Sequence, residues 1–152
     1  MKEISGNLIT LAEVGEFDVI VHGCNAFCKF GIGLAKEIKC KYPQAYEADL
    51  KTSYGDVNKL GNYSFTKVKS RNSDIYFYII NAYIQYYYGY GKDNVNYIAI
   101  RNVFRKISEN FNTFKIGIPM IGSGYAGGNW MCISSIIQEE LKNVNYTLVK
   151  YE

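Results

Sequence analysis

Two separate parts of the chain follow the same order: a short apolar run, a glycine-rich loop, and a stretch with helical periodicity. The first apolar run covers residues 17–23, and its loop leads into a helical stretch at residues 33–42. Pro43 then either ends this helix or begins another. The second run covers residues 115–120, and its loop extends through Gly128. Because short apolar runs bounded by glycine are typical of strands buried on both faces of a sheet, these units predict an α/β fold.

The remaining periodic segments complete the predicted sheet and its helices. Residues 62–68 and 75–81 have the composition of strands, and the polar residues between them predict a hairpin or meander, so we expect a mixed sheet. Residues 95–111 have apolar side chains at helical spacing, namely Ile100, Val103, Phe104, Ile107 and Phe111. A final helix is expected to begin after Asn129 as its N-cap. A last strand is predicted at residues 146–151.

Length and charge limit the classes of protein to which the chain can belong. Its 152 residues, 48% hydrophobic and 20% charged, fit one globular domain. The longest apolar runs are strand-sized and much shorter than the roughly 20 residues of a membrane span, and the N-terminus has no signal-like apolar segment, so we expect a cytoplasmic protein. A formal net charge of +3 is too small and too dispersed for duplex nucleic acid and favours a small anionic partner.

The cysteines and the single histidine do not form a pattern that binds metal. Cys24, Cys28, Cys40 and Cys132 lack the paired spacing of a zinc site, and His22 alone cannot complete the usual ligand sets. We therefore expect no metal, and thiols that are reduced and mostly buried.

The two glycine-rich loops suit a diphosphate. Glycine permits positive φ angles and lets backbone N–H groups approach a ligand, and a helix N-terminus adds the positive end of its dipole. Neither loop matches the Walker pattern or the dinucleotide-binding fingerprint. A tight turn is an alternative interpretation for either loop alone. Two such loops in one chain favour anion binding.

At the level of motifs the chain resembles a macrodomain over nearly its whole length. The resemblance rests on four segments in order, Gly6-Asn7-Leu8, His22-Gly23-Cys24-Asn25, Gly31-Ile32-Gly33 and Ile118-Pro119-Met120-Ile121-Gly122-Ser123-Gly124. They are similar to the branch that includes ADP-ribose 1''-phosphate phosphatases and the hydrolases that remove ADP-ribose from glutamate. This implies a single macrodomain over residues 1–152, a three-layer α/β/α fold with a mixed central sheet, and a ligand cleft at the strand ends.

The resemblance also implies a role for each motif residue in binding ADP-ribose. Asn7 and Leu8 would contact the edge of the adenine, and Tyr151 would stack on its face. Most macrodomains have an aspartate in place of Asn7, so here the hydrogen bond to adenine would lack charge assistance. Asn25 would bind the distal ribose. The residues expected to approach that ribose and the diphosphate are Gly31, Ile32, Gly33, Ile121, Gly122, Ser123, Gly124 and Tyr125.

His22 and Asn25 are the predicted catalytic residues. His22 is the only side chain whose unperturbed pKa lies near neutrality, which suits proton transfer; the alternative is that it hydrogen-bonds a neighbouring backbone group. Strand alternation would point His22 and Asn25 to opposite faces, so both reach one cleft only if the chain leaves strand geometry near Gly23. The glutamate-type hydrolases use a lysine and an aspartate where this chain has residues 81–83 and Ala126, which disfavours their mechanism.

Residues 83–90 contain five tyrosines in all. Aromatic rings can stack on bases, but no lysine or arginine lies between Asp74 and Gly91. Nucleic-acid binding is therefore disfavoured, and we expect a tyrosine-lined loop beside the cleft.

Three functions stay open for the chain. The first is a phosphatase that converts ADP-ribose 1''-phosphate to ADP-ribose and phosphate, with His22 assisting proton transfer. The second is a non-catalytic reader of ADP-ribose, and the third is a hydrolase that removes ADP-ribose from modified protein or nucleic acid. The expected partner is ADP-ribose or ADP-ribose 1''-phosphate, with no cofactor, no metal and no membrane, and we expect a monomer.

Overall fold

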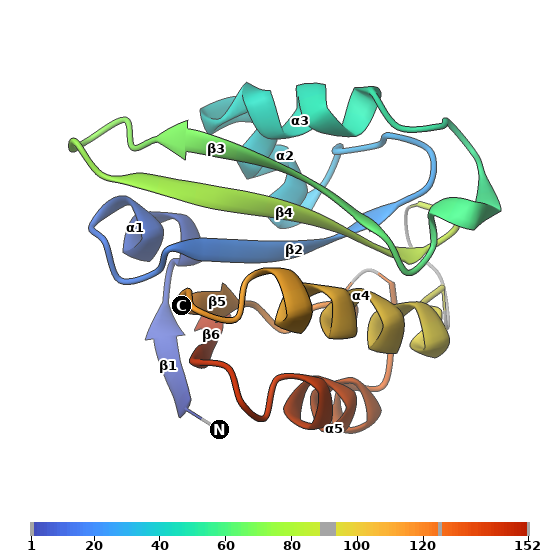
Figure 1. Cartoon of the computed structure of the whole chain (residues 1–152). Helices are drawn as coiled ribbons and strands as arrows, with labels where there is room; N and C mark the ends of the chain where they lie inside the picture. The colour runs from blue at the N-terminus through green and yellow to red at the C-terminus, as the bar shows by residue number, and fades with distance from the viewer. Residues whose placement is uncertain (1, 89–93, 125, 152) are drawn as a thin grey trace.

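The computed structural model describes residues 2–88, 94–124 and 126–151, which form a six-stranded sheet with helices on both faces (Figure 1). The strands are β1 (Lys2–Gly6), β2 (Val19–Asn25), β3 (Tyr63–Lys69), β4 (Tyr76–Gln85), β5 (Ile116–Ile118) and β6 (Tyr146–Tyr151). The helices are α1 (Leu8–Glu13), α2 (Gly33–Lys41), α3 (Pro43–Leu50), α4 (Tyr97–Asn110) and α5 (Trp130–Glu140), with a 3₁₀ turn at Val57–Lys59.

The sheet has the strand order β1-β6-β5-β2-β4-β3. Neighbouring strands run parallel except for β3 and β4, which are antiparallel and form the predicted hairpin. The prediction of a mixed sheet is therefore confirmed. β2 lies between β4 and β5 and is buried along most of its length, as its apolar sequence indicates.

Two hydrophobic clusters pack the helices against the two faces of the sheet. On one face, Val21 and Ile80 pack with α4 and α5, through residues such as Phe104 and Ile137. On the other face, Ile20 belongs to a cluster with residues of α1, α2 and α3, namely Leu8, Ile9, Ala12, Ile38 and Ala45. Figure 1 shows α2 and α3 at the top, next to β3, and α4 and α5 in the lower half of the view. The predicted three-layer α/β/α fold is confirmed.

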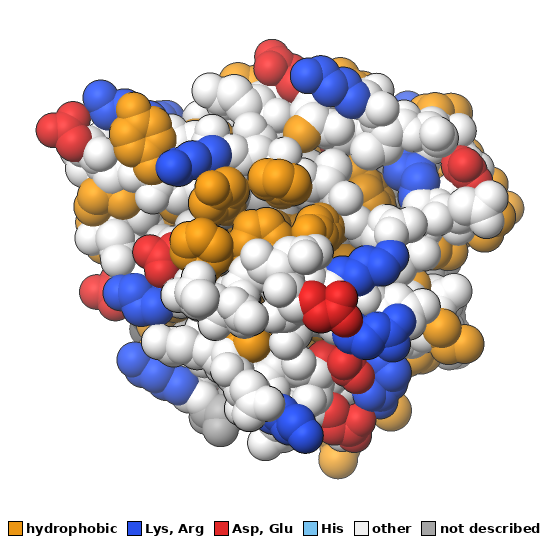
Figure 2. All heavy atoms as spheres, in the orientation of Figure 1, with side chains coloured by type: hydrophobic (Ala, Val, Ile, Leu, Met, Phe, Trp, Pro, Cys, Tyr) orange, Lys and Arg blue, Asp and Glu red, His pale blue; other side chains and the backbone are white. Residues whose placement is uncertain are grey.

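The outer part of the α4 face carries aromatic side chains. Figure 2 shows hydrophobic side chains gathered where β3, β4 and the end of α4 meet. Phe65 on the edge strand is 48% exposed, and its ring contacts those of Tyr63, Tyr78 and Phe111. This patch extends the packing of the sheet on α4, and no cavity described below reaches it.

None of the helices in the described ranges is long and apolar enough to cross a membrane.

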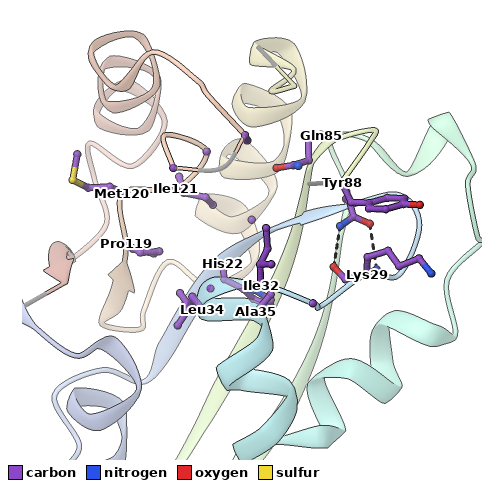
Figure 3. Close-up of a pocket in the computed structure, with 17 residues that line it drawn as sticks. His22, Lys29, Ile32, Leu34, Ala35, Gln85, Tyr88, Pro119, Met120 and Ile121 are labelled. Atoms are coloured by element: carbon purple, nitrogen blue, oxygen red, sulfur yellow. Dashed lines mark hydrogen bonds between the residues drawn. The ribbon is translucent and has the colours of Figure 1, made fainter. Parts of the chain in front are cut away.

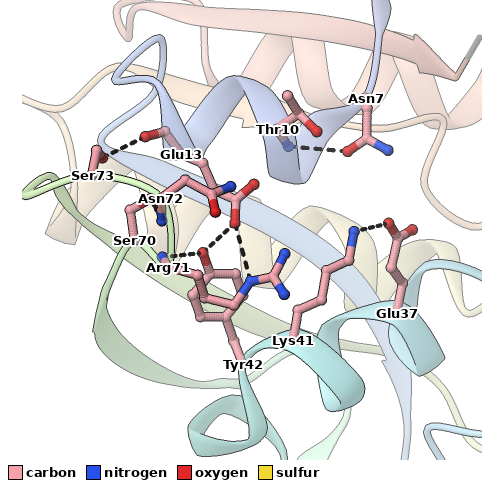
Figure 4. Close-up of polar contacts among 10 residues, drawn as sticks. All are labelled: Asn7, Thr10, Glu13, Glu37, Lys41, Tyr42, Ser70, Arg71, Asn72 and Ser73. Carbon is pink, nitrogen blue, oxygen red and sulfur yellow. Dashed lines mark hydrogen bonds and ion pairs between the residues drawn. The ribbon is translucent and has the colours of Figure 1, made fainter.

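A polar network joins α1 to the β3–β4 hairpin (Figure 4). The Tyr42 hydroxyl, between α2 and α3, donates to the buried Glu13 Oε2 at 2.5 Å, and Arg71 Nε lies 3.4 Å from the same oxygen. The backbone N–H of Arg71 in turn donates to the Tyr42 hydroxyl. Three segments that are distant in sequence are thereby held beside one another.

The structure settles one open alternative from the sequence and corrects one prediction. Pro43 begins a helix of its own, α3, which settles the alternative that the sequence left open. The prediction of mostly buried thiols is wrong for half of the cysteines, because Cys24 and Cys28 are buried whereas Cys40 and Cys132 are exposed. The exposed pair lie on the outward sides of α2 and α5, which periodicity around Ile38 and Ile133 could have indicated.

Candidate functional site

The two glycine-rich loops meet at one edge of the sheet. Because β2 and β5 are parallel neighbours, the loops that follow them leave the sheet side by side. Between them lies a cavity of about 330 Å³, which we call the first cavity (Figure 3). The predicted site residues that line it are His22, Asn25, Gly31, Ile32, Gly33, Ile121, Gly122 and Gly124. The structure thus brings together residues from both loops.

A second cavity, of about 490 Å³, lies toward β1 and β6. Asn7, Leu8 and Tyr151 line it, which are the three residues that the resemblance assigns to adenine. Gly33, Leu34 and Pro119 line both cavities, so the two form one elongated cleft. Tyr151 is 82% exposed, so its ring is available to a ligand. Contact of these residues with adenine stays a prediction.

Asn7 has a local role that its motif did not reveal. Its side-chain oxygen accepts a hydrogen bond of 3.0 Å from the backbone N–H of Thr10 and so caps α1 (Figure 4). An amide oxygen has a second lone pair, and the Asn7 side-chain nitrogen donates to no group in the described ranges. Capping therefore leaves Asn7 able to bind a ligand in the second cavity.

The glycines of the loops differ in their backbone angles. Gly33 has a φ of 58° and Gly122 a φ of 75°, and residues that carry a side chain rarely adopt such positive φ angles. Gly31 and Gly124 have no positive φ, and a Cβ atom built on either would meet nothing within 4 Å. The expected need for positive φ therefore applies at Gly33 and Gly122. Gly31 and Gly124 instead leave open space toward the cleft.

Asn25 shapes the first loop. Its side-chain oxygen accepts hydrogen bonds from the backbone N–H groups of Phe27 and Lys29, and its side-chain nitrogen donates to the Lys29 carbonyl. The pairing of β2 with β4 shifts register between Cys24 and Asn25. The expected departure from strand geometry therefore occurs just beyond Gly23. As a result Asn25 reaches the wall of the first cavity with its amide oriented by the loop.

His22 lies in the wall of the first cavity but is only 2% exposed. Its Nε2 is 2.6 Å from the side-chain oxygen of Asn81, whose side-chain nitrogen donates to the Ala45 carbonyl and the Ser64 hydroxyl. This network requires that Nε2 carry the proton and donate to Asn81. Burial lowers the pKa of His22 to about 4, so the ring is neutral at pH 7. Nδ1 is left as the unprotonated nitrogen, 3.8 Å from Cys24 Sγ.

Beneath the first loop lies a group of buried polar side chains that the sequence analysis did not identify. Asp49 is fully buried, and its Oδ1 accepts a hydrogen bond of 2.6 Å from the Tyr83 hydroxyl. Burial, with this contact, raises the pKa of Tyr83. The Lys59 ammonium donates to the carbonyl of Ala26 in the loop and lies over the Tyr83 ring. These contacts support the loop from below, and no local sequence pattern marks them.

Of the two other predicted residues of the second loop, only Ser123 is among the described residues, and it lines neither cavity. Tyr125 lies outside the described residues. The Ser123 hydroxyl donates to the Met120 carbonyl at 2.7 Å, and the Ser123 backbone N–H makes a longer bond of 3.4 Å to the same oxygen. Ser123 therefore closes the turn of the second loop, and Gly122 and Gly124 on either side of it line the first cavity.

The end of the first cavity farthest from the second contains three residues that the sequence analysis did not single out for the site. Lys29, Gln85 and Tyr88 line it together (Figure 3). Tyr88 belongs to the tyrosine-rich segment, part of which therefore lies beside the cleft, whereas Tyr83 is buried in β4.

In the described ranges, no group of three or more His, Cys, Asp or Glu side chains is arranged to hold a metal ion.

The fold and the cleft can be compared with known proteins. No family model matches the chain. An uncharacterized 17.5 kDa protein from the tk–vs intergenic region of Enterobacteria phage T4 is 34% identical over 158 aligned residues, which cover 100% of this chain and 97% of that protein. A macrodomain protein from Streptomyces coelicolor has a TM-score of 0.73 at 21% identity and covers 98% of each chain. DarTG of Thermosipho africanus, solved in complex with ADP-ribose, has a TM-score of 0.75 at 14% identity over 100% of this chain and 42% of its own.

Proposed function

Because the chain belongs to the same family as the 17.5 kDa phage T4 protein and has the macrodomain fold, we propose that it binds ADP-ribose in the cleft between its two glycine-rich loops. The observation that carries this proposal is the continuity of the two cavities through Gly33, Leu34 and Pro119. ADP-ribose has a nucleoside at one end, a ribose at the other and a diphosphate between them. A two-chambered cleft with glycines at its middle matches that shape.

The middle of the cleft presents backbone groups suited to a diphosphate. Asparagine side chains cap α1, α4 and α5. No side chain caps α3 or α2, of which α2 begins at Gly33 in the cleft. The first N–H groups of α2 are thus left for a ligand, and the helix dipole favours an anion there. Gly124 adds unshielded backbone on the opposite wall. Adenine then lies beside Asn7 and Tyr151, and the distal ribose beside Asn25.

Calorimetric titration tests this proposal. ADP-ribose is expected to bind with a micromolar dissociation constant, about −7 to −9 kcal/mol. AMP should bind more weakly, because it fills the second cavity but lacks the groups that reach the first. Absence of heat at millimolar ADP-ribose would contradict the proposal.

A second candidate function is the hydrolysis of ADP-ribose 1''-phosphate. The observation that favours it is the absence of any carboxylate among the described residues that line the first cavity, so that a terminal phosphate meets no like charge there. Water would attack phosphorus, forming a new P–O bond while the bond to the ribose oxygen breaks and that oxygen leaves as the 1''-hydroxyl. Backbone N–H groups of the second loop would stabilise the developing charge, and Asn25 would position the ribose.

His22 is the group proposed to assist proton transfer in this reaction. With Nε2 donating to Asn81, the basic nitrogen is Nδ1, which is unprotonated at pH 7 as a base requires. His22→Ala should then lower phosphate release about a hundredfold or more while ADP-ribose affinity changes little. Equal rates for the two proteins would leave His22 a structural residue.

Turnover assays also distinguish the other two candidate functions, a reader of ADP-ribose and a hydrolase that removes ADP-ribose from protein or nucleic acid. A reader of ADP-ribose would bind the phosphate compound without releasing phosphate. A hydrolase of modified protein or nucleic acid would instead release ADP-ribose from those substrates. Turnover measured on all three substrates in parallel distinguishes these outcomes.

A further inference from the structure

Lys29 is the one charged residue among the described residues that line the first cavity, since the pKa of His22 keeps that ring neutral at pH 7. Its backbone is held in place, because its N–H donates to the Asn25 side chain and its carbonyl accepts from it. No carboxylate lies within ion-pair distance of its ammonium in the described part of the chain. Lys29 is exposed, so this uncompensated positive charge lies at the rim of the first cavity.

The position of Lys29 places this charge at one end of the cleft. Figure 3 shows Lys29 and Tyr88 together, across the cavity from Pro119 and Met120. Pro119 is one of the residues shared with the second cavity, so Lys29 lies at the far end from it. The Lys29 ammonium is 5.7 Å from the centroid of the Tyr88 ring. A cation–π contact orients the ammonium without cancelling its charge.

We propose that Lys29 selects ligands whose distal ribose carries a phosphate at the 1'' position. This inference rests on the proposed function, which places adenine in the second cavity and the distal ribose beside Asn25. Any group attached to that ribose then extends toward Lys29, Gln85 and Tyr88. An ammonium stabilises a phosphate dianion more than a hydroxyl, through both charge and hydrogen bonding.

The alternative is that Lys29 binds the diphosphate that every ADP-ribose ligand contains. Gly33 lines both cavities and so marks the middle of the cleft, where the diphosphate is expected, whereas Lys29 lines the first cavity alone. The two roles differ in a measurable way. A lysine at the diphosphate strengthens all ligands equally, whereas a lysine at the 1'' position strengthens the phosphorylated ligand alone.

The experiment compares ADP-ribose with ADP-ribose 1''-phosphate on four proteins: the unsubstituted chain, Lys29→Gln, Lys29→Arg and Lys39→Gln. Lys39 is the matched control, because its ammonium also lies over a tyrosine ring, 4.3 Å from the centroid of Tyr46, but lines neither cavity. Dissociation constants are measured by calorimetry. If a protein releases phosphate from ADP-ribose 1''-phosphate, its Michaelis constant from initial rates is used in place of the dissociation constant for that ligand.

Three of the proteins should bind the phosphorylated ligand about tenfold more tightly than ADP-ribose: the unsubstituted chain, Lys29→Arg and Lys39→Gln. This ratio is typical of one charge-assisted contact. In Lys29→Gln the two ligands should bind equally. A ratio that survives in Lys29→Gln, or an equal loss for both ligands, would overturn the role of Lys29 while leaving ADP-ribose binding intact. Failure of the unsubstituted chain to bind either ligand would instead overturn the proposed function and this role together.

Discussion

At the scale of single residues, the glycines of the second loop have two different functions. Gly122 has a positive φ, and a Cβ there would lie 3.2 Å from side-chain atoms of both Ile133 and Val95. Gly124 has an ordinary backbone and open space. The sequence shows only that both positions are glycine, because φ depends on how the loop closes after β5. The structure therefore separates a glycine required for folding from one required for ligand access.

Two substitutions test this separation. Gly124→Val should change the free energy of unfolding by less than about 0.5 kcal/mol, yet weaken ADP-ribose binding at least tenfold because the new side chain stands in the cleft. Gly122→Val should destabilise the fold by about 2 kcal/mol or more through its φ angle and crowding. Thermal denaturation and calorimetry on both variants measure these effects. Equal destabilisation of the two would refute the assignment.

His22 is a residue whose surroundings the sequence could not predict. Its motif suggested a proton-transfer group or a hydrogen bond to nearby backbone, and the structure pairs the His22 ring with the side chain of Asn81 on β4. The two are register partners on neighbouring strands, and strand pairing is a property of the folded sheet.

The pH dependence of unfolding follows from the pKa of His22, which is lowered from 6.5 to about 4 by burial. As pH falls from 6.5 to 4, the unfolded chain takes up a proton that the folded chain does not, so the free energy of unfolding decreases. The decrease attributable to His22 is of the order of 3 kcal/mol across this window. Denaturant titrations of the parent chain and His22→Gln, at pH 7 and pH 4.5, should show a smaller acid loss in the variant. Parallel losses would mean that His22 is not buried as a neutral ring.

At the scale of secondary structure, the apolar pattern predicted the buried elements, including the three-residue β5, and missed two elements near the N-terminus. The helix of residues 95–111 and the hairpin strands were predicted because each has a clear apolar period. β1 and α1 were not predicted, since β1 is mostly exposed and α1 has only six residues. β1 is stabilised by pairing with β6 at the other end of the chain, which local sequence cannot indicate. Asn7 before an apolar pair could have indicated the start of α1.

Tyr42→Phe tests the contact that joins these elements. The substitution removes the hydrogen bond to the buried Glu13 carboxylate and leaves it with Arg71 alone. We expect a loss of about 2 kcal/mol in the free energy of unfolding, measured by urea denaturation. Tyr146→Phe is the control, because the half-buried Tyr146 hydroxyl has no hydrogen bond among the described residues. Similar values for the two variants would show that the Glu13 network contributes no stability.

At the scale of the whole molecule, the cleft exists because β2 and β5 are neighbours in the sheet, although two strands and three α-helices separate them in sequence. The motif order predicted that both glycine-rich loops would lie at one site, and the structure places eight of the predicted residues in the first cavity. At the far end, the composition of residues 83–90 predicted tyrosines beside the cleft, but no motif predicted that Lys29 would lie beside Tyr88. Those two residues meet through the pairing of β2 with β4 and the loops that follow.

The central claim is that ADP-ribose occupies the cleft, and the backbone amide resonances of the isotopically labelled protein test it most directly. As ADP-ribose is added, the resonances of Gly31, Gly33, Gly122 and Gly124 should shift together and saturate at micromolar ligand, because these residues line the cleft. Those of Thr66 on the edge strand and Glu139 on α5, which line neither cavity, should stay in place. Resonances that do not move at millimolar ADP-ribose, or shifts confined to residues outside the two cavities, would contradict the account.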